Sequence, residues 1–194
     1  MEDARRRGRR TFLGLAALFL LPVVVAFTLY YGKVWRPAGT SSKGELIEPA
    51  RPLAVAGLRH PDGTAAGAGV FKDKWSLIYI GDGACDADCR EALVYARQSR
   101  LALNNEMTRV QRVFLATSRC CANDYFAQEH PGMIALDASS PEAQALLAQF
   151  PADHARSLYI VDPLGNLMMR HDGERTSKDL LSDLKKLLKL SHIG

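Results

Sequence analysis

The chain has 194 residues, of which 25 are Lys or Arg and 21 are Asp or Glu, and 47% are hydrophobic. This length fits one domain with an appendage, and the composition excludes collagen-like, low-complexity and globally disordered proteins. Arginines crowd the first ten residues, so the rest of the chain is close to neutral. A nucleic-acid partner is disfavoured, because phosphate binding requires a basic face on the folded part.

Residues 11–31 contain no charged side chain and are long enough to cross a membrane as one helix. A hydrocarbon core of about 30 Å needs roughly 20 helical residues. Pro22 lies within the segment, and proline is tolerated in membrane helices. Tyr30, Tyr31 and Trp35 are typical of the aromatic belt at a membrane interface. The segment is predicted to be a transmembrane anchor.

The charges on either side of this segment predict its orientation. The arginine-rich residues 1–10 precede it, and only Lys33 and Arg36 follow it closely. Positive charge stays on the cytoplasmic side, so we expect a cytoplasmic tip and a C-terminal domain across the membrane. Glu2 and Asp3 are unlike an acid-poor mitochondrial transit peptide, which favours a single-pass protein of the bacterial inner membrane with a periplasmic domain.

Two other interpretations of the N-terminal segment stay open. A cleaved signal peptide has a shorter apolar region and a small-residue cleavage site, and no convincing site lies near Tyr31. The string Arg-Arg-Thr-Phe-Leu at residues 9–13 resembles a twin-arginine export signal. Residues 32–51 are rich in Pro, Gly and Ser and are predicted to be a linker, which leaves residues 52–194 as the folded domain.

The folded domain alternates between predicted strands and predicted helices. Short apolar runs predict strands at residues 75–80, 110–116, 133–136, 158–161 and 166–170. Composition, caps and periodicity predict helices at residues 88–103, at residues 141–150 and from Thr176 or Ser177 onward. This order implies an α/β domain with a partly parallel sheet, and the final hairpin plus helix resembles the thioredoxin-like plan.

Cys85 and Cys89 lie at the junction between the first apolar strand and its helix. A spacing of four places both sulfurs on one face of a helical turn, where they can close a disulfide or bind a soft cation such as copper or zinc. Asp82, Asp86 and Asp88 surround the pair. Carboxylates oppose the ionisation of a thiol but attract a cation, which favours metal binding over fast thiol chemistry. Two structural cysteines remain the alternative.

His154 stands four residues before the predicted strand at 158–161. Sites in α/β sheets form where strand ends and their loops meet. A loop that enters one strand faces the loop that leaves another only if the two strands are antiparallel or the loop is long. The sequence leaves that contact open.

The combination of these features resembles the Sco/SenC family of membrane-anchored, thioredoxin-like proteins. Three features match in order: the N-terminal anchor, the C-x3-C pair after a buried strand, and the string D-H-x4-Y-I-V-D-P-x-G from residue 153 onward. The resemblance implies that Cys85, Cys89 and His154 bind copper, as Cu(I) or Cu(II). It also implies a copper-handling assembly factor, or metallochaperone, whose partner is a cytochrome c oxidase subunit or another copper or thiol client.

The chain departs from the family pattern around the cysteine pair. Asp86 and Arg90 replace the two prolines that usually follow the cysteines, and Gly81–Ala84 replaces an aromatic-Thr lead-in. A thiol–disulfide oxidoreductase is therefore the main alternative, with the same two cysteines as catalytic residues acting on an oxidase copper site or another envelope client. A thiol peroxidase and a non-catalytic scaffold are weaker alternatives.

Cys120 and Cys121 follow the predicted strand at residues 110–116. In a parallel sheet they would lie beside the end of the first strand. They are either a second thiol pair, which exchanges with or hands copper to the first pair, or one buried cysteine with an incidental neighbour. We favour the second interpretation, because a free cysteine often serves only as a small buried hydrophobe.

Overall fold

The computed structural model describes residues 2–32, 41–118, 120–121, 124–151, 154, 156–172 and 176–194, without the side chains of residues 2–5 and 124. The chain divides into two compact units, Met1–Ser41 and Ser42–Gly194. Lys33, Trp35 and Arg36, which we named for the charge flank and the aromatic belt, lie outside the described residues.

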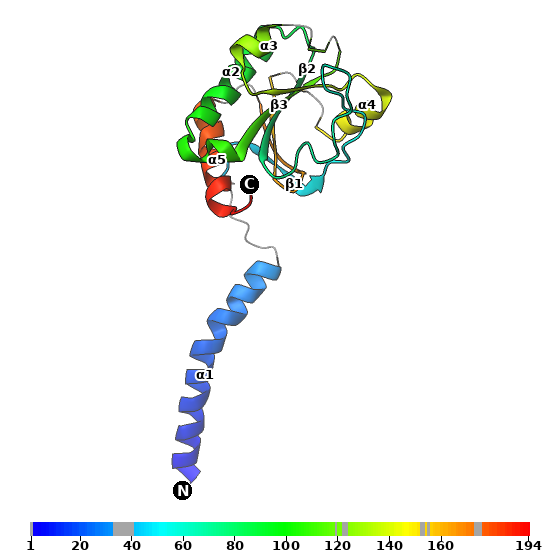
Figure 1. Ribbon diagram of the computed structural model, residues 1–194. Coiled ribbons are helices and arrows are strands. Elements are labelled where there is room, and N and C mark those ends of the chain that lie inside the picture. The colour runs from blue at the N-terminus through cyan, green and yellow to red at the C-terminus, as the bar shows by residue number, and fades with distance from the viewer. Residues whose placement is uncertain are drawn as a thin grey trace. The chain divides into compact units, whose positions relative to one another are not determined.

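The first unit is a single long helix, α1, which runs from Glu2 to Tyr31 with Pro22 inside it (Figure 1). Residues Arg6–Tyr31 are long and apolar enough to cross a membrane, at about 39 Å for 26 helical residues. Their apolar side chains are exposed, with Phe19 at 74% and Leu18 at 68%. This helix is a candidate membrane span by length and composition, and a signal sequence near the N-terminus passes the same test.

The second unit is built on a six-stranded mixed sheet with the order β1-β6-β5-β2-β3-β4. Its strands are β1 (Glu45–Pro52), β2 (Trp75–Gly81), β3 (Val110–Ala116), β4 (Ile134–Asp137), β5 (Leu158–Val161) and β6 (Asn166–His171). The strands β2, β3 and β4 are parallel, whereas β5 is antiparallel to β2 and β6 is antiparallel to both β5 and β1.

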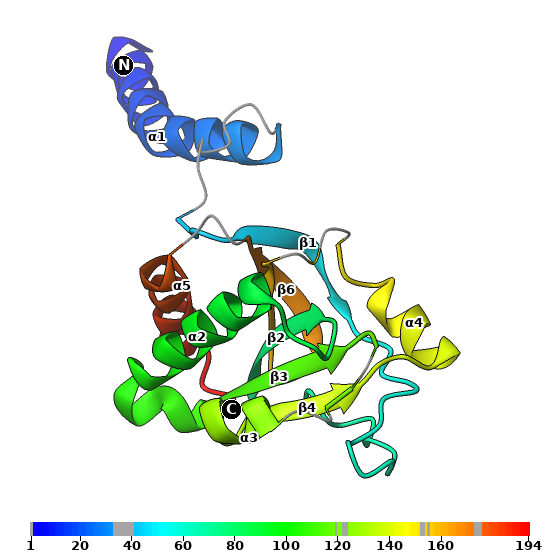
Figure 2. The same cartoon turned by 90° about the horizontal axis from the view of Figure 1, so that it is seen from above.

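Helices cover both faces of this sheet, and both faces are therefore apolar. The helices are α2 (Ala87–Leu101), the 3-10 helix η1 (Asn104–Arg109), α3 (Asp124–Glu129), α4 (Pro141–Leu147) and α5 (Ser177–Leu190). Figures 1 and 2 show α2 and α5 side by side on one face and α4 on the other. Side chains along β2 alternate between the faces, so Tyr79 packs on the α2 side and Ile80 on the α4 side.

The thioredoxin-like α/β fold is confirmed, but the expected linker is too long. Residues 32–51 were assigned to it, whereas Glu45–Pro52 forms β1 and pairs with β6, for example through Glu45 and Arg170. The sequence hides this strand because it lies at the sheet edge with almost every side chain exposed, so no apolar alternation marks it. Its prolines are also permitted only at such an edge.

Candidate functional site

The turn between β2 and α2 carries the first cysteine pair, and two aspartates shape it. The backbone carbonyl of Asp82 accepts from the Cys85 amide at 3.0 Å, and its Oδ1 accepts from the Ala84 amide at 2.7 Å. Asp86 is the N-cap of α2, where its Oδ1 accepts from the Cys89 amide at 2.9 Å. Asp82 and Asp86, which we expected to attract a cation, therefore also stabilise the turn that carries the cysteines.

Cys85 and Cys89 form a disulfide, and their Cα atoms are 5.1 Å apart. Cys85 has a φ of 48°, a left-handed conformation that directs its side chain back toward the first turn of α2. Each cysteine is only 2% exposed and packs against the apolar cluster between the sheet and α2. The pair is thus a redox-capable dithiol, and its sulfurs become metal ligands only after reduction.

His154 reaches the same end of the sheet because β5 runs antiparallel to β2. Tyr79 of β2 pairs with Leu158 of β5, so the loop entering β5 faces the loop leaving β2. This settles the strand direction that the sequence left open. His154 Nδ1 lies 2.9 Å from the hydroxyl of Tyr159, and that hydroxyl donates to the carbonyl of Pro151 at 3.0 Å. With its proton committed to Pro151, the Tyr159 oxygen accepts from Nδ1–H, which assigns the ring proton to Nδ1.

An arginine ties the His154 loop to the helix of the cysteines. Arg156 Nε lies 3.3 Å from Asp88 Oδ1, and Arg156 Nη2 donates to Glu91 Oε2 at 2.9 Å. Hydrogen bonds from Tyr95 and from Arg156 lower the pKa of Glu91. The third acid near the cysteines, Asp88, is therefore engaged in holding together the two loops that make the site.

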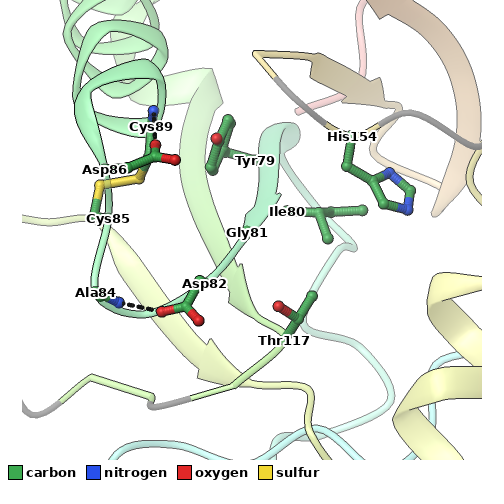
Figure 3. A pocket seen from close by; sticks show the side chains of 10 residues that line it. All are labelled: Tyr79, Ile80, Gly81, Asp82, Ala84, Cys85, Asp86, Cys89, Thr117 and His154. Atoms are coloured by element: carbon green, nitrogen blue, oxygen red, sulfur yellow. Dashed lines mark hydrogen bonds between the residues drawn. A yellow bond between two sulfur atoms is a disulfide. The ribbon is translucent and has the colours of Figure 1, made fainter.

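The two loops enclose a cavity of about 360 Å³ at the carboxyl end of β2. It is lined by Tyr79, Ile80, Gly81, Asp82, Ala84, Cys85, Asp86, Cys89, Thr117 and His154 (Figure 3). Burial, followed by the negative charges of Asp86 and Asp88, raises the pKa of Tyr79 to about 12, so this phenol is neutral at physiological pH. The cavity brings together all three residues expected at the site.

The three donors share this cavity but do not form a metal cage in the disulfide-bonded state. Among the residues that the structure describes, no three His, Cys, Asp or Glu side chains are close enough to hold one ion. Figure 3 shows the disulfide and the His154 ring on opposite sides of the pocket, with Tyr79 and Ile80 between them in that view. Two sulfurs and an imidazole nitrogen are a donor set that suits copper chemically, and the sulfurs could serve as ligands only after reduction.

The second cysteine pair lies in the next loop along the same sheet edge. Cys120 and Cys121 also form a disulfide, and both pack against the cluster that contains Cys85 and Cys89. The interpretation of one buried cysteine with an incidental neighbour is therefore wrong for this structure, because both residues are half-buried and joined to each other.

Sequence reasoning missed three residues that shape the site, Tyr79, Tyr159 and Arg156. Tyr79 and Tyr159 look like ordinary strand residues in the sequence, and Arg156 looks like a loop charge. Their roles follow from the pairing of β2 with β5, which single-sequence patterns do not reveal. The string from residue 153 onward did contain Tyr159, but only as a motif position.

Comparison with known proteins now identifies the family. The family described as transmembrane-like, thioredoxin-like, C-terminal domain matches residues 75–191, more than half of the chain. The chain belongs to this family. No curated protein sequence matches it closely enough to be called a relative.

Solved structures of the same fold include Sco1 proteins, some with copper bound, and a thiol-disulfide oxidoreductase. Apo Sco1 from Thermus thermophilus is 21% identical with a TM-score of 0.61, over 77% of this chain and 99% of that chain. Copper-bound yeast Sco1 is 19% identical with a TM-score of 0.60, over 78% and 95%. The thioredoxin domain of a thiol-disulfide oxidoreductase from Bacteroides vulgatus is 16% identical with a TM-score of 0.52, over 76% and 99%. At these identities the likeness establishes the fold, and the resemblance to Sco/SenC proteins holds at that level.

Proposed function

We propose that this chain is a membrane-anchored copper-binding assembly factor that holds its cargo between Cys85, Cys89 and His154. The observation that carries the proposal is the cavity that all three residues line at one end of the sheet. A pair of soft sulfurs and an imidazole opposite them, from loops distant in sequence, is a donor set suited to copper.

Reduction of the disulfide is the first requirement, because only free thiolates bind the ion. The start of α2 offers backbone N–H groups that stabilise negative charge on Cys85 and Cys89. Nδ1 of His154 holds the ring proton, so Nε2 carries the lone pair that a metal needs. Movement of the His154 loop toward the sulfurs would complete the ligand set after the ion enters.

The recipient and the location follow from the resemblance and from the charge pattern. As in Sco/SenC proteins, the expected client is a copper-binding subunit of cytochrome c oxidase. The arginine-rich residues 1–10 favour a cytoplasmic tip and a periplasmic domain, with α1 anchored in a bacterial inner membrane. The anchor would keep the copper site near a membrane-embedded client.

Anaerobic Cu(I) titration of the reduced full chain in detergent, in competition with a chromophoric chelator, tests the proposal. We expect one tightly bound copper per chain and its loss in Cys85→Ser and Cys89→Ser. The His154→Ala variant should bind copper more weakly, whereas His192→Ala, at the C-terminal end, should bind it like the unaltered protein. Copper retention that is the same in all of these variants would contradict the proposal.

A second function is favoured by one specific observation, the closed disulfide with no third donor in reach among the described residues. In this function Cys85 attacks a client disulfide, and Cys89 resolves the mixed disulfide and leaves the client reduced. His154 would then be dispensable. Disulfide reduction that survives in His154→Ala, together with unchanged copper binding, would support the oxidoreductase and exclude the three-ligand site.

A further inference from the structure

We propose that Cys120 and Cys121 form a second redox-active pair, which passes electrons to the Cys85–Cys89 disulfide and so readies that pair for its ligand. The inference deepens the proposed function and rests on it, because it assigns a source for the reduction that copper binding requires. It is carried by contacts that join the segments on both sides of the second pair to the turn of the first, by the difference in exposure, and by a second cavity.

The contacts before the second pair join its loop to the cysteine turn. Gly81 at the end of β2 is in register with Ala116 at the end of β3, so the segments that follow these two strands leave the sheet side by side. The Gly83 amide donates to the Ser118 carbonyl at 2.9 Å, and Ser118 Oγ donates to Asp82 Oδ2 at 2.6 Å. The second pair thus begins two residues after a segment bonded to the turn of Cys85.

The contacts after the second pair return to the same turn. The guanidinium of Arg90 lies 4.9 Å from the centre of the Tyr125 ring in α3, and Arg90 Nε donates to the carbonyl of Cys85 at 3.2 Å. Phe126, the next residue, is buried in the apolar cluster that contains Cys85 and Cys89. Described residues on both sides of Cys120 and Cys121, Ser118 and Tyr125, are therefore linked to the turn of Cys85.

The two pairs differ in accessibility, which decides which of them an external protein dithiol reaches first. Cys85 and Cys89 are 2% exposed, whereas Cys120 and Cys121 are only half-buried. Cys121 also lines a second cavity of about 610 Å³ on the α3 side, beside Phe126, His130 and Met133. A protein dithiol donor therefore meets the second pair more readily than the first.

The exchange is balanced within the chain. In the reduced second pair, one thiolate attacks a sulfur of the Cys85–Cys89 disulfide, which forms a mixed disulfide and releases the other sulfur of the first pair as a thiolate. The remaining cysteine of the second pair then attacks its neighbour in the mixed disulfide. Cys120 and Cys121 end oxidised, Cys85 and Cys89 end as thiols, and two electrons and two protons have moved. An external protein dithiol would reduce the second pair again.

Trapping of the mixed disulfide is the direct test. In the full-length Cys89→Ser variant, Cys85 has no partner in its own turn, so it should attack the Cys120–Cys121 disulfide. Acid quenching, alkylation and peptide mass mapping should find a peptide from the Cys85 turn joined to one that contains Cys120 or Cys121. Recovery of alkylated Cys85 alone, with the second disulfide intact, would overturn the proposal.

A rate measurement gives a second readout. With reduced thioredoxin as the probe dithiol, the full-length Cys120→Ser/Cys121→Ser variant should lose its Cys85–Cys89 disulfide at least tenfold more slowly than the unaltered chain. Reduction by a small phosphine, which enters the first cavity directly, should be unchanged and shows that the variant is folded. Equal rates with thioredoxin would refute the relay.

Copper binding separates this inference from the proposed function. The chemically reduced Cys120→Ser/Cys121→Ser variant should still bind one copper, because its three ligands remain. If it binds copper but shows no change in reduction rate, the relay fails and the copper site stands. If no reduced variant binds copper while the mixed disulfide forms, the site is a redox dithiol with a relay and the copper function fails.

Discussion

The hydroxyl of Tyr159 accepts a hydrogen bond from Nδ1–H of His154 and donates one to the carbonyl of Pro151. Tyr159 is fully buried in the central strand β5, and its ring also packs against Phe150. The tautomer and direction of the imidazole are thus set by the core of the sheet. An outer partner of this kind orients a metal-binding histidine.

Replacement of Tyr159 by Phe tests that role. We expect copper affinity to fall about tenfold, because the ring loses the partner that fixes its tautomer. The partly buried Nδ1–H loses its acceptor, so the free energy of unfolding should also fall by about 1–2 kcal/mol. Chelator competition and urea unfolding measure the two effects. Tyr125→Phe is the matched control, because it removes a hydroxyl 3.1 Å from His130, outside the first cavity, and should leave copper affinity unchanged.

Asp86 offers a way to separate capping from charge at the cysteine turn. Asp86→Ala removes the acceptor of the Cys89 amide and should lower the free energy of unfolding by about 1 kcal/mol, whereas Asp86→Asn keeps a capping oxygen and should cost less. Both variants remove a negative charge that raises the pKa of Tyr79, so that pKa should fall in both. Urea unfolding and ultraviolet titration of tyrosinate give the two readouts. Equal destabilisation by Ala and Asn would contradict the capping role.

Tyr79 makes the stability of the domain depend on alkaline pH. Its folded pKa of about 12 lies above the ordinary value of 10.0, so the folded state keeps a proton that the unfolded chain releases. The contribution is complete below pH 10, and it is lost as the pH rises from 10 toward 12. Unfolding free energies measured from pH 9 upward should decline more steeply in the unaltered protein than in Tyr79→Phe. Parallel curves for the two proteins would contradict this assignment.

Arg156 should matter more for the site than for stability. Its pairs with Asp88 and Glu91 are solvent-exposed, so Arg156→Gln should change the unfolding free energy little. The same change frees the His154 loop from α2, and we expect weaker copper binding and a higher pKa for Glu91. Carbon-detected titration of Glu91 and chelator competition test this. Arg59→Gln, which removes an exposed arginine bonded to the Gly63 carbonyl at 3.1 Å, is the control expected to leave both unchanged.

A buried carboxylate secures the start of the second unit. Asp183 in α5 is 1% exposed, accepts from the Lys43 and Gly44 amides at 2.7 and 2.8 Å, and lies 3.3 Å from His171. Asp183→Ala leaves these groups without their acceptor, so the unfolding free energy should fall by about 3–5 kcal/mol. Asp179→Ala, in the capping box of the same helix, should cost about 1 kcal/mol. Similar losses in the two variants on urea unfolding would contradict this role of Asp183.

The sequence predicted the elements whose apolar patterns are strong and missed those whose patterns are weak. The strands at 110–116 and 158–161 were predicted with the observed bounds, because both are buried on both faces. The six-residue α3 is too short for a periodic signal, and the exposed strand β1 has none. Local pattern is thus sufficient where burial is continuous along an element.

The candidate ligand residues of the site could be predicted from the sequence, but their arrangement in space could not. The spacing of Cys85 and Cys89 and their position at a strand–helix junction identified them as candidate site residues. The motif identified His154. Their meeting in one cavity depends on the antiparallel pairing of β2 and β5, which is a property of the whole sheet.

The position of β5 between β2 and β6 also dictates when the site comes into being. Synthesis from the N-terminus delivers the cysteine turn well before the strand pair that positions the imidazole. A partly synthesised chain therefore contains both cysteines before it contains the strands that close the sheet beside them. The cavity lined by Cys85, Cys89 and His154 is complete only after β5 and β6 have joined the sheet, so the site is among the last features of the domain to form.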